Sequence, residues 1–283
     1  MACIPDALRA ATARLSETSS TPRLDAELLM AHALDMSRQD MLLRMAEVSV
    51  PDEFAALLAR RAAHEPIAHI TGRQDFWDLE LDVTPDVLIP RPDSETLIEA
   101  AQELLASQPP RRIADLGTGS GALLLAALRL FAGAEGIGID ASAAALGIAR
   151  GNADRNALAD RAVFALADWH QPGWRDALGP PVDLILCNPP YVETGAALPD
   201  SVARYEPAPA LFAGVGGMDD YAILLPQLGE LLAPDGTAIF EIGAEQWQPV
   251  RGLAEACGFA AALRRDLAGK PRAVILRRAA SGA

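Results

Sequence analysis

The second half of the chain alternates short apolar runs with amphipathic helical stretches, and this alternation restricts the possible fold more than any other feature. It begins at Arg111. Parallel strands need a long crossover between them, usually a helix, so the alternation predicts a parallel sheet with helices on both faces. The strands are expected at residues 112–116, 136–140, 162–167, 182–187 and 237–242, and the helices at 122–130, 142–156 and 221–232.

The C-terminal end departs from this alternation. Two apolar runs, at 261–266 and 273–277, flank the turn sequence Gly269-Lys270-Pro271. This pattern predicts two strands joined by a turn, which form an antiparallel hairpin at the sheet edge. The expected fold class is therefore α/β, with a Rossmann-like domain at residues 93–283 whose sheet is mainly parallel.

The first seventy residues have helical periodicity and no strand signal. Pro22 can occupy the first turn of a helix, where its missing N–H costs nothing. Ser37 and Asp40 have the spacing of a capping box, and Pro51 is expected to open a further helix. Residues 1–70 are therefore predicted to form a small helical bundle.

A short alternating segment follows the bundle. Leu79, Leu81 and Val83 alternate with acidic residues at the period of a half-buried strand. We expect a β-hairpin linker at residues 71–92, joining the bundle to the α/β domain.

Composition excludes several classes of protein. Half of the residues are hydrophobic (51%) and 22% are charged, as in ordinary globular proteins. The chain has 24 basic and 38 acidic residues, and a net charge of −14 repels a phosphate backbone. There is no apolar run of about 18 residues and no basic segment followed by an apolar one at the N-terminus. We expect a cytoplasmic protein with no membrane contact and no direct nucleic-acid binding.

The three cysteines are widely spaced and have no accompanying histidine cluster. They are Cys3, Cys187 and Cys257. An odd number without a Cys-x-x-Cys pair favours reduced thiols over a disulfide framework or a zinc site. No metal is expected.

A glycine-rich loop lies where the first strand of the domain ends and its first helix begins. It has the sequence Asp115-Leu116-Gly117-Thr118-Gly119-Ser120-Gly121. Glycines at this turn let a ligand lie against bare backbone, and the helix N-terminus contributes N–H donors. The loop also satisfies the dinucleotide-binding template, and a tight turn without a ligand is the structural alternative.

Acidic residues near this loop favour one cofactor. Asp115 would repel a pyrophosphate but suits an ammonium group, which S-adenosylmethionine carries on its methionine part. Asp140 ends the second strand, where a carboxylate accepts hydrogen bonds from ribose hydroxyls; a helix N-cap is its alternative role. Asp168 and Trp169 follow the third strand, where they would accept the adenine amine and pack against the ring.

The segment Asn188-Pro189-Pro190-Tyr191 follows the fourth strand, at the sheet edge where parallel sheets carry out chemistry. A strand ended by two prolines is the structural alternative. Placed downstream of the glycine loop, however, this tetrapeptide resembles the amino-group methyltransferases. These act on planar nitrogen in DNA adenine, certain RNA guanines and the side-chain amide of glutamine.

The chemistry of a planar nitrogen explains why these residue types are needed. Its lone pair is delocalised, so it is a poor nucleophile. The Asn188 side-chain oxygen and the Pro189 carbonyl can each accept one N–H of the substrate and favour the charge that develops during methyl transfer. The prolines stiffen the loop, and Tyr191 is expected to supply a flat wall. No strong general base is required.

Three further segments narrow the resemblance to one family. The stretches 65–72 and 89–95, together with Phe76-Trp77, are similar to the bacterial peptide chain release factor N5-glutamine methyltransferases, the HemK/PrmC family. This resemblance runs from about Glu65 to the C-terminus. It implies a class I S-adenosylmethionine-dependent methyltransferase domain, preceded by a helical bundle that recognises the substrate.

The family resemblance also implies an activity and its site residues. The family methylates the glutamine of the Gly-Gly-Gln motif in class 1 release factors, and S-adenosyl-L-homocysteine is the product. By position, the cofactor contacts fall on 117–121, Asp140, Trp169 and Asn188, and the glutamine contacts on 188–191. The turn at 89–95 is expected to wall the active site without contributing a catalytic group.

Other interpretations of the sequence stay open. Ser94 stands where many relatives have threonine, and the hydroxyl is kept. A glutamine methyltransferase of a ribosomal protein shares the tetrapeptide but usually differs in the turn at 89–95. A nucleic-acid amino methyltransferase would need a basic surface, and a non-catalytic binding protein would be expected to lose part of the loop or tetrapeptide. We expect a monomer.

Overall fold

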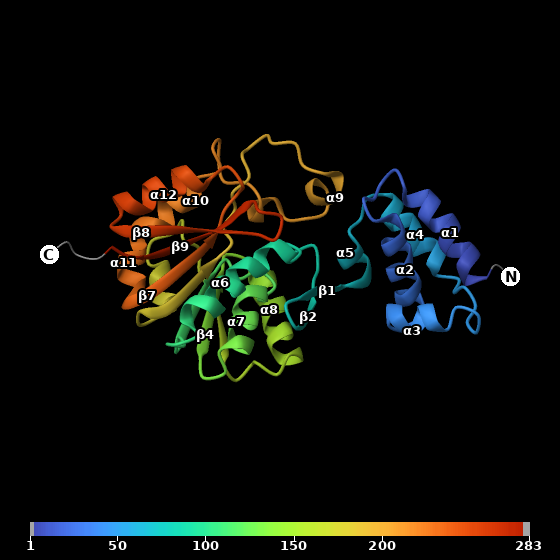
Figure 1. The fold of residues 1–283 in the computed structure, drawn as a ribbon, viewed down its shortest axis with the longest axis horizontal. Coiled ribbons are helices and arrows are strands. Elements are labelled where there is room, and N and C mark those ends of the chain that lie inside the picture. Colours follow the sequence, from blue (N-terminus) through green and yellow to red (C-terminus); the bar gives the residue numbers. More distant parts are fainter. Residues whose placement is uncertain (1–2, 280–283) are drawn as a thin grey trace. The chain divides into compact units, whose positions relative to one another are not determined.

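The computed structural model describes residues 3–279, which divide into two compact units. One unit contains the chain up to Arg73 together with Leu198–Glu206, and the other contains Gln74–Ala197 and the chain from Pro207 onward. Figure 1 labels the elements of both units.

The N-terminal unit is a bundle of short helices, as the sequence predicts. Pro22 lies in the first turn of its helix, and the Ser37 hydroxyl accepts a hydrogen bond from the Asp40 amide at 3.0 Å. The helix expected from Pro51 begins three residues later. The bundle helices are α1 (Ile4–Leu15), α2 (Pro22–Ala33), α3 (Arg38–Leu43), α4 (Phe54–Ala62) and α5 (Ile67–Thr71).

A segment from far along the chain belongs to this same unit. Leu198–Glu206 contains α9 (Asp200–Ala203). The Tyr205 hydroxyl donates a hydrogen bond of 2.9 Å to the carbonyl of Ala63, at the end of α4. This segment therefore depends on the bundle for part of its packing.

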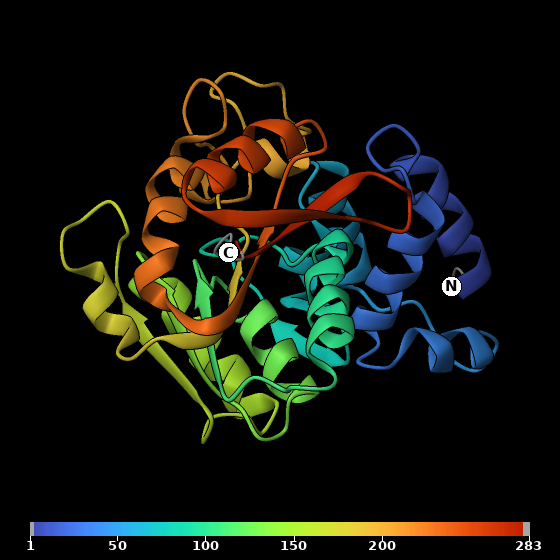
Figure 2. The same ribbon diagram turned by 60° about the vertical axis from the view of Figure 1, so that its left-hand side comes forward.

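The larger unit is built on a seven-stranded sheet in the order β5-β4-β3-β6-β7-β9-β8. The first five of these strands pair in parallel, and β9 pairs antiparallel with β7 and β8. Figure 2 shows the β8–β9 hairpin in red. The expected α/β fold with an antiparallel C-terminal hairpin is confirmed. The strands are β3 (Arg112–Leu116), β4 (Glu135–Asp140), β5 (Ala162–Leu166), β6 (Val182–Cys187), β7 (Leu232–Glu241), β8 (Phe259–Arg265) and β9 (Pro271–Arg278).

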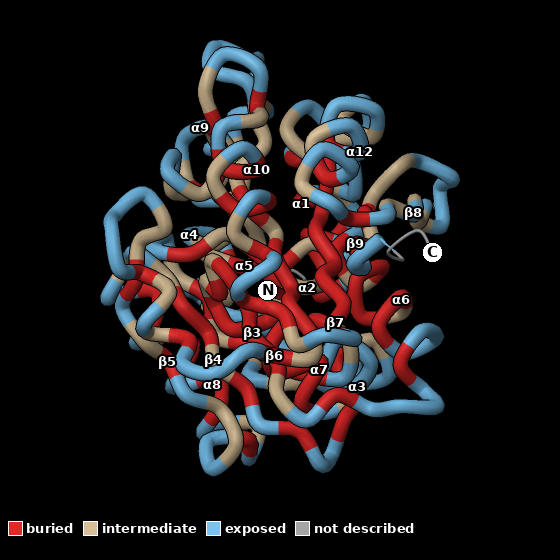
Figure 3. The backbone as a smooth tube through the Cα atoms, turned by 90° about the vertical axis from the view of Figure 1, so that its left-hand side faces the viewer, coloured by how far each residue is buried: buried red, intermediate tan, exposed pale blue. Residues whose placement is uncertain are grey.

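Helices cover both faces of this sheet, because its buried strands alternate their side chains between two apolar layers. Leu184 and Leu186 pack with α6, α7 and α8, whereas Ile185 packs with α10, α11 and α12 on the other face. The tube in Figure 3 is red along the central strands, which marks them as buried. The helices are α6 (Glu95–Leu105), α7 (Ala122–Leu130), α8 (Ala143–Arg155), α10 (Asp219–Leu224), α11 (Leu228–Leu231) and α12 (Trp247–Ala256).

The hairpin expected before this domain is present as β1 (Arg73–Phe76) and β2 (Leu79–Asp82). Leu79 and Leu81 of β2 are buried in the same apolar layer as α7. The side-chain amide of Asn152, on α8, exchanges hydrogen bonds with the backbone of Asp82 at 2.7 and 3.0 Å. The hairpin is therefore fastened to the α/β domain by both apolar and polar contacts.

One predicted helix is wrong. Residues 221–232 do not form a continuous helix, because α10 and α11 are separated by a 3₁₀ turn at Leu225–Gln227. Pro226 lies in that turn, and a proline removes a helical hydrogen bond and clashes with the preceding turn. The chain then enters β7 at Leu232, five residues before the expected start of that strand. Among residues 3–279, no helix is long and apolar enough to cross a bilayer.

Candidate active site

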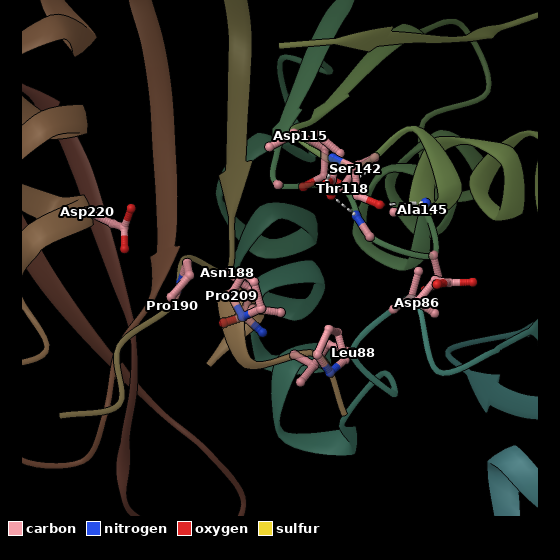
Figure 4. A pocket seen from close by; sticks show the side chains of 18 of the residues that line it. Asp86, Leu88, Asp115, Thr118, Ser142, Ala145, Asn188, Pro190, Pro209 and Asp220 are labelled. Atoms are coloured by element: carbon pink, nitrogen blue, oxygen red, sulfur yellow. Dashed lines mark hydrogen bonds between the residues drawn. The ribbon is translucent and has the colours of Figure 1, made fainter. Parts of the chain in front are cut away.

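A cavity of about 710 Å³ opens at the carboxyl ends of the parallel strands. In the sheet, Leu116 at the end of β3 is paired with Cys187 at the end of β6 and with Ile139 of β4. The residues that follow these three strand ends therefore emerge side by side. Figure 4 shows Asp115 and Thr118 from the first of these loops and Asn188 and Pro190 from another.

The glycine loop follows a path that side chains would obstruct. Gly117, Gly119 and Gly121 all have positive φ, at 72°, 54° and 87°. The Gly117 and Thr118 amides both donate to the Ile139 carbonyl at 2.9 Å, which fastens the loop to β4. A Cβ added at Gly117 would lie 3.0 Å from the Trp169 ring, so this glycine is required by conformation and by space.

Asp115 places a buried carboxylate on the cavity wall. Its Oδ2 accepts a hydrogen bond of 2.7 Å from the Thr118 hydroxyl, while Oδ1 has no hydrogen-bond partner within the described residues. Burial raises the pKa of Asp115 to about 7, although hydrogen bonds from the Thr118 hydroxyl and the Leu124 backbone amide oppose this rise. An unpaired buried acceptor is costly unless a ligand satisfies it, so this oxygen suits a cationic donor such as an ammonium group.

Asp140 is held rigidly beside the loop. Its two carboxylate oxygens accept hydrogen bonds from the Gly119 amide at 2.9 Å and the Ser142 amide at 2.8 Å. The N-cap of α8 is Ser142, whose hydroxyl accepts a hydrogen bond from the Ala145 amide at 3.2 Å. Asp140 is therefore not the N-cap of this helix. Each carboxylate oxygen keeps acceptor capacity for a further donor.

The third strand end contributes Asp168 and Trp169, which also line the cavity. A hydrogen bond from the His170 amide, 2.9 Å long, lowers the pKa of Asp168. The indole nitrogen of Trp169 donates to Asp220 at 2.6 Å, and His170 Nε2 lies 3.4 Å from the same oxygen. The Trp169 ring is thereby fixed across Gly117.

The tetrapeptide after β6 is divided between the cavity wall and the protein interior. Asn188 and Pro190 line the cavity, whereas Pro189 and Tyr191 are not among the described residues that line it. The Tyr191 hydroxyl instead donates to the Glu241 carboxylate at 3.1 Å. The expected role of Tyr191 as a flat wall against the substrate stays a prediction.

The remaining predicted residues lie as follows. Thr118 and Ser120 line the cavity, whereas Gly121, the N-cap residue of α7, does not. Within residues 3–279, no cluster of three or more histidine, cysteine, aspartate or glutamate side chains is arranged to hold a metal ion.

Sequence reasoning missed two buried carboxylates of the site. Asp220 lines the cavity and is 3% exposed; burial raises its pKa. Glu241 ends β7 and is 1% exposed. A signal for Glu241 was available, because an acidic residue interrupts an otherwise apolar run at the end of a central strand.

Comparison with known proteins identifies the family. Family models match residues 6–72 (PrmC N-terminal domain) and 109–262 (methyltransferase domain). The release factor glutamine methyltransferase of Bradyrhizobium diazoefficiens is 40% identical over 288 residues, which cover 97% of this chain and 95% of that protein. The chain belongs to the release factor glutamine methyltransferase family. The member from Rhodospirillum rubrum is 43% identical over 267 residues, or 92% of this chain and 80% of that protein.

Solved structures support the fold of this family member. The catalytic domain of hMettl16 in complex with MAT2A 3′UTR hairpin 6 has a TM-score of 0.57 and 17% sequence identity. The match covers 80% of this chain and 84% of that one. At this identity the likeness concerns the methyltransferase fold alone.

Proposed function

We propose that this protein transfers a methyl group from S-adenosylmethionine to the side-chain amide nitrogen of the glutamine in the Gly-Gly-Gln motif of class 1 release factors. The observation that carries this proposal is that Asn188 and the glycine loop line the same cavity. Membership of the release factor glutamine methyltransferase family supports the choice of acceptor over a ribosomal protein or a nucleic acid.

The residues around the glycine loop fit S-adenosylmethionine. The unpartnered Oδ1 of Asp115 is a buried acceptor that a methionine ammonium group would satisfy. Gly119 has positive φ and open space on its Cβ side, so a ligand can approach its backbone. We assign Asp140 to the ribose hydroxyls, and Asp168 and Trp169 to the adenine. When bound, this cofactor supplies an electrophilic methyl group.

The tetrapeptide prepares the acceptor nitrogen. The Asn188 side-chain oxygen and the Pro189 carbonyl each accept one N–H of the substrate amide, which fixes the nitrogen in one orientation. Both interactions strengthen as positive charge develops on that nitrogen, so they stabilise the transition state more than the ground state. Proline at 189 and 190 removes two backbone donors that would compete for these acceptors. We assign Tyr191 to the flat wall against the planar group of the substrate.

The N-terminal bundle is assigned a role in binding the release factor. A single glutamine side chain offers too little contact to orient a weak nucleophile, so binding energy must come from a larger part of the release factor. We assign the recognition of a remote part of that protein to residues 1–70, followed by the linker at 71–92 and the catalytic domain at 93–283. We further propose that the enzyme acts as a monomer, in the cytoplasm, without nucleic acid or metal.

The experiment that tests this proposal uses labelled S-adenosylmethionine and three separate acceptors. They are a class 1 release factor, the same factor with its motif glutamine replaced by alanine, and duplex DNA. We expect label in the first acceptor alone. Equal labelling of the alanine variant of the factor would show that another residue is modified. Labelling of DNA alone would show that the acceptor is a nucleic acid and not a release factor.

A further inference from the structure

The buried carboxylate of Glu241 lies behind the tetrapeptide and has no role in the proposed methyl transfer. In the sheet, Phe240 of β7 is paired with Cys187 of β6. The next residues along the two strands, Glu241 and Asn188, therefore lie next to each other. Glu241 is 1% exposed and does not belong to the described cavity lining. Its carboxylate accepts hydrogen bonds from the Ser94 hydroxyl at 2.5 Å and the Tyr191 hydroxyl at 3.1 Å.

These contacts determine which group donates and which accepts in each hydrogen bond. An ionised carboxylate can only accept, and a serine hydroxyl has a single proton to donate. Because Ser94 gives that proton to Glu241, its oxygen can only accept from its next neighbour. That neighbour is the Asn188 amide, whose Nδ2 lies 3.5 Å from the Ser94 oxygen.

The direction of these hydrogen bonds determines the orientation of the Asn188 amide, which could otherwise face either way. The two ends of an asparagine amide are nearly equal in size, and they differ in whether they donate or accept. A Ser94 oxygen that can only accept holds the NH₂ end of Asn188. The Oδ1 end is thereby left for the substrate nitrogen, which needs an acceptor.

We propose that Glu241 and Ser94 are positioning residues that fix the Asn188 amide with its oxygen available to the substrate glutamine. Glu241 reaches the tetrapeptide twice, through Ser94 to Asn188 and directly to Tyr191. This inference rests on the proposed function, because it assigns a purpose to the acceptor oxygen of Asn188.

Other contacts keep the carboxylate in place. The Arg272 guanidinium lies 4.0 Å from Glu241, and it also pairs with Asp93 at 2.8 Å, one residue before Ser94. Burial raises the pKa of Glu241, whereas the Ser94 hydroxyl, Arg272 and the Tyr191 hydroxyl act in the opposite direction. The backbone carbonyl of Glu241 separately accepts from the Tyr221 hydroxyl at 2.6 Å.

The test is a double-mutant cycle between Ser94 and Asn188, measured as kcat for methyl transfer to a release factor. Ser94→Ala should lower kcat about 10–100-fold, the scale of a misplaced reacting group. It should change KM and the affinity for S-adenosylmethionine less than about twofold. In an Asn188→Ala background, Ser94→Ala should lower kcat no further.

Three additional variants separate orientation from folding. Ser94→Thr keeps the hydroxyl and should recover most of kcat, whereas Glu241→Leu, which removes both acceptor oxygens, should resemble Ser94→Ala. Tyr221→Phe is the matched control: it removes a buried hydrogen bond to the backbone of residue 241 and should lower the melting temperature while kcat is retained.

The outcomes are distinguishable from failure of the proposed function. If the native enzyme does not methylate the motif glutamine, the proposed function is wrong. If the native enzyme does so but the losses from Ser94→Ala and Asn188→Ala simply multiply, Ser94 does not act through Asn188 and the inference is overturned. The same holds if Ser94→Ala retains native kcat, or if Ser94→Thr is as slow as Ser94→Ala.

Discussion

The ionisation of Asp115 should make cofactor affinity depend on pH. Burial raises the pKa of this carboxyl to about 7 in the protein without ligand. An ammonium group pairs with the carboxylate and not with the neutral acid, so binding requires Asp115 to lose its proton. The affinity should therefore fall as the pH is lowered below about 7, where the ammonium group stays charged.

The size of this effect follows from the pKa. With a pKa of about 7, the ionised fraction of Asp115 falls from about 0.76 at pH 7.5 to about 0.03 at pH 5.5. The protonation of Asp115 by itself should therefore raise the dissociation constant for S-adenosylmethionine about 25-fold over this range. At pH 6.5, binding should release about three quarters of a proton from Asp115.

Isothermal titration calorimetry measures both quantities, when each pH is examined in buffers of different ionisation enthalpy. Asp115→Asn keeps the size of the side chain and removes the titration, so its affinity should be lower at pH 7.5 and nearly independent of pH. A native affinity that does not change between pH 7.5 and 5.5, with no proton released, would refute the assignment of Asp115 to the ammonium group.

Three further predictions concern the cofactor loop and the bundle. Asp140→Ala should weaken S-adenosylmethionine binding by about 2–3 kcal/mol, measured by calorimetry, because a charged acceptor is lost. Unchanged affinity would show that Asp140 does not contact the cofactor. Gly117→Ala should weaken binding at least tenfold, because φ is 72° and the added Cβ would meet Trp169, whereas Gly151→Ala, at an open helical position, should not. Deletion of residues 1–70 should raise KM for a full release factor far more than for a Gly-Gly-Gln peptide, and equal increases would show that the bundle only supports folding.

Much of the fold could be predicted because local sequence patterns determine it. The strands 112–116 and 182–187 and the helix 122–130 have the predicted bounds, since buried apolar runs end at clear turn signals. The broken helix was missed where Pro226 interrupts an apolar pattern that otherwise continues. In that case the conformational restriction of one residue outweighed the periodicity of its neighbours.

The candidate site could be predicted only where its residues are close in sequence. The loop at 115–121 and the tetrapeptide at 188–191 are local motifs, and the sheet brings them to one cavity. The contact between Ser94 and Glu241 joins residues 147 positions apart, and no local pattern indicates it. Asp220 was missed because acidic residues are common in the first turn of a helix, where they favour the helix dipole.

The most direct test of the central claim is single-turnover methyl transfer to a release factor, with the position of the methyl group determined by mass spectrometry. The native enzyme should place one methyl group on the side-chain amide of the motif glutamine. Asn188→Ala should place it at the same position but about 10²–10³-fold more slowly, with the affinity for S-adenosylmethionine changed much less. Transfer by Asn188→Ala at close to the native rate would contradict the account, because Asn188 would then be a structural turn residue.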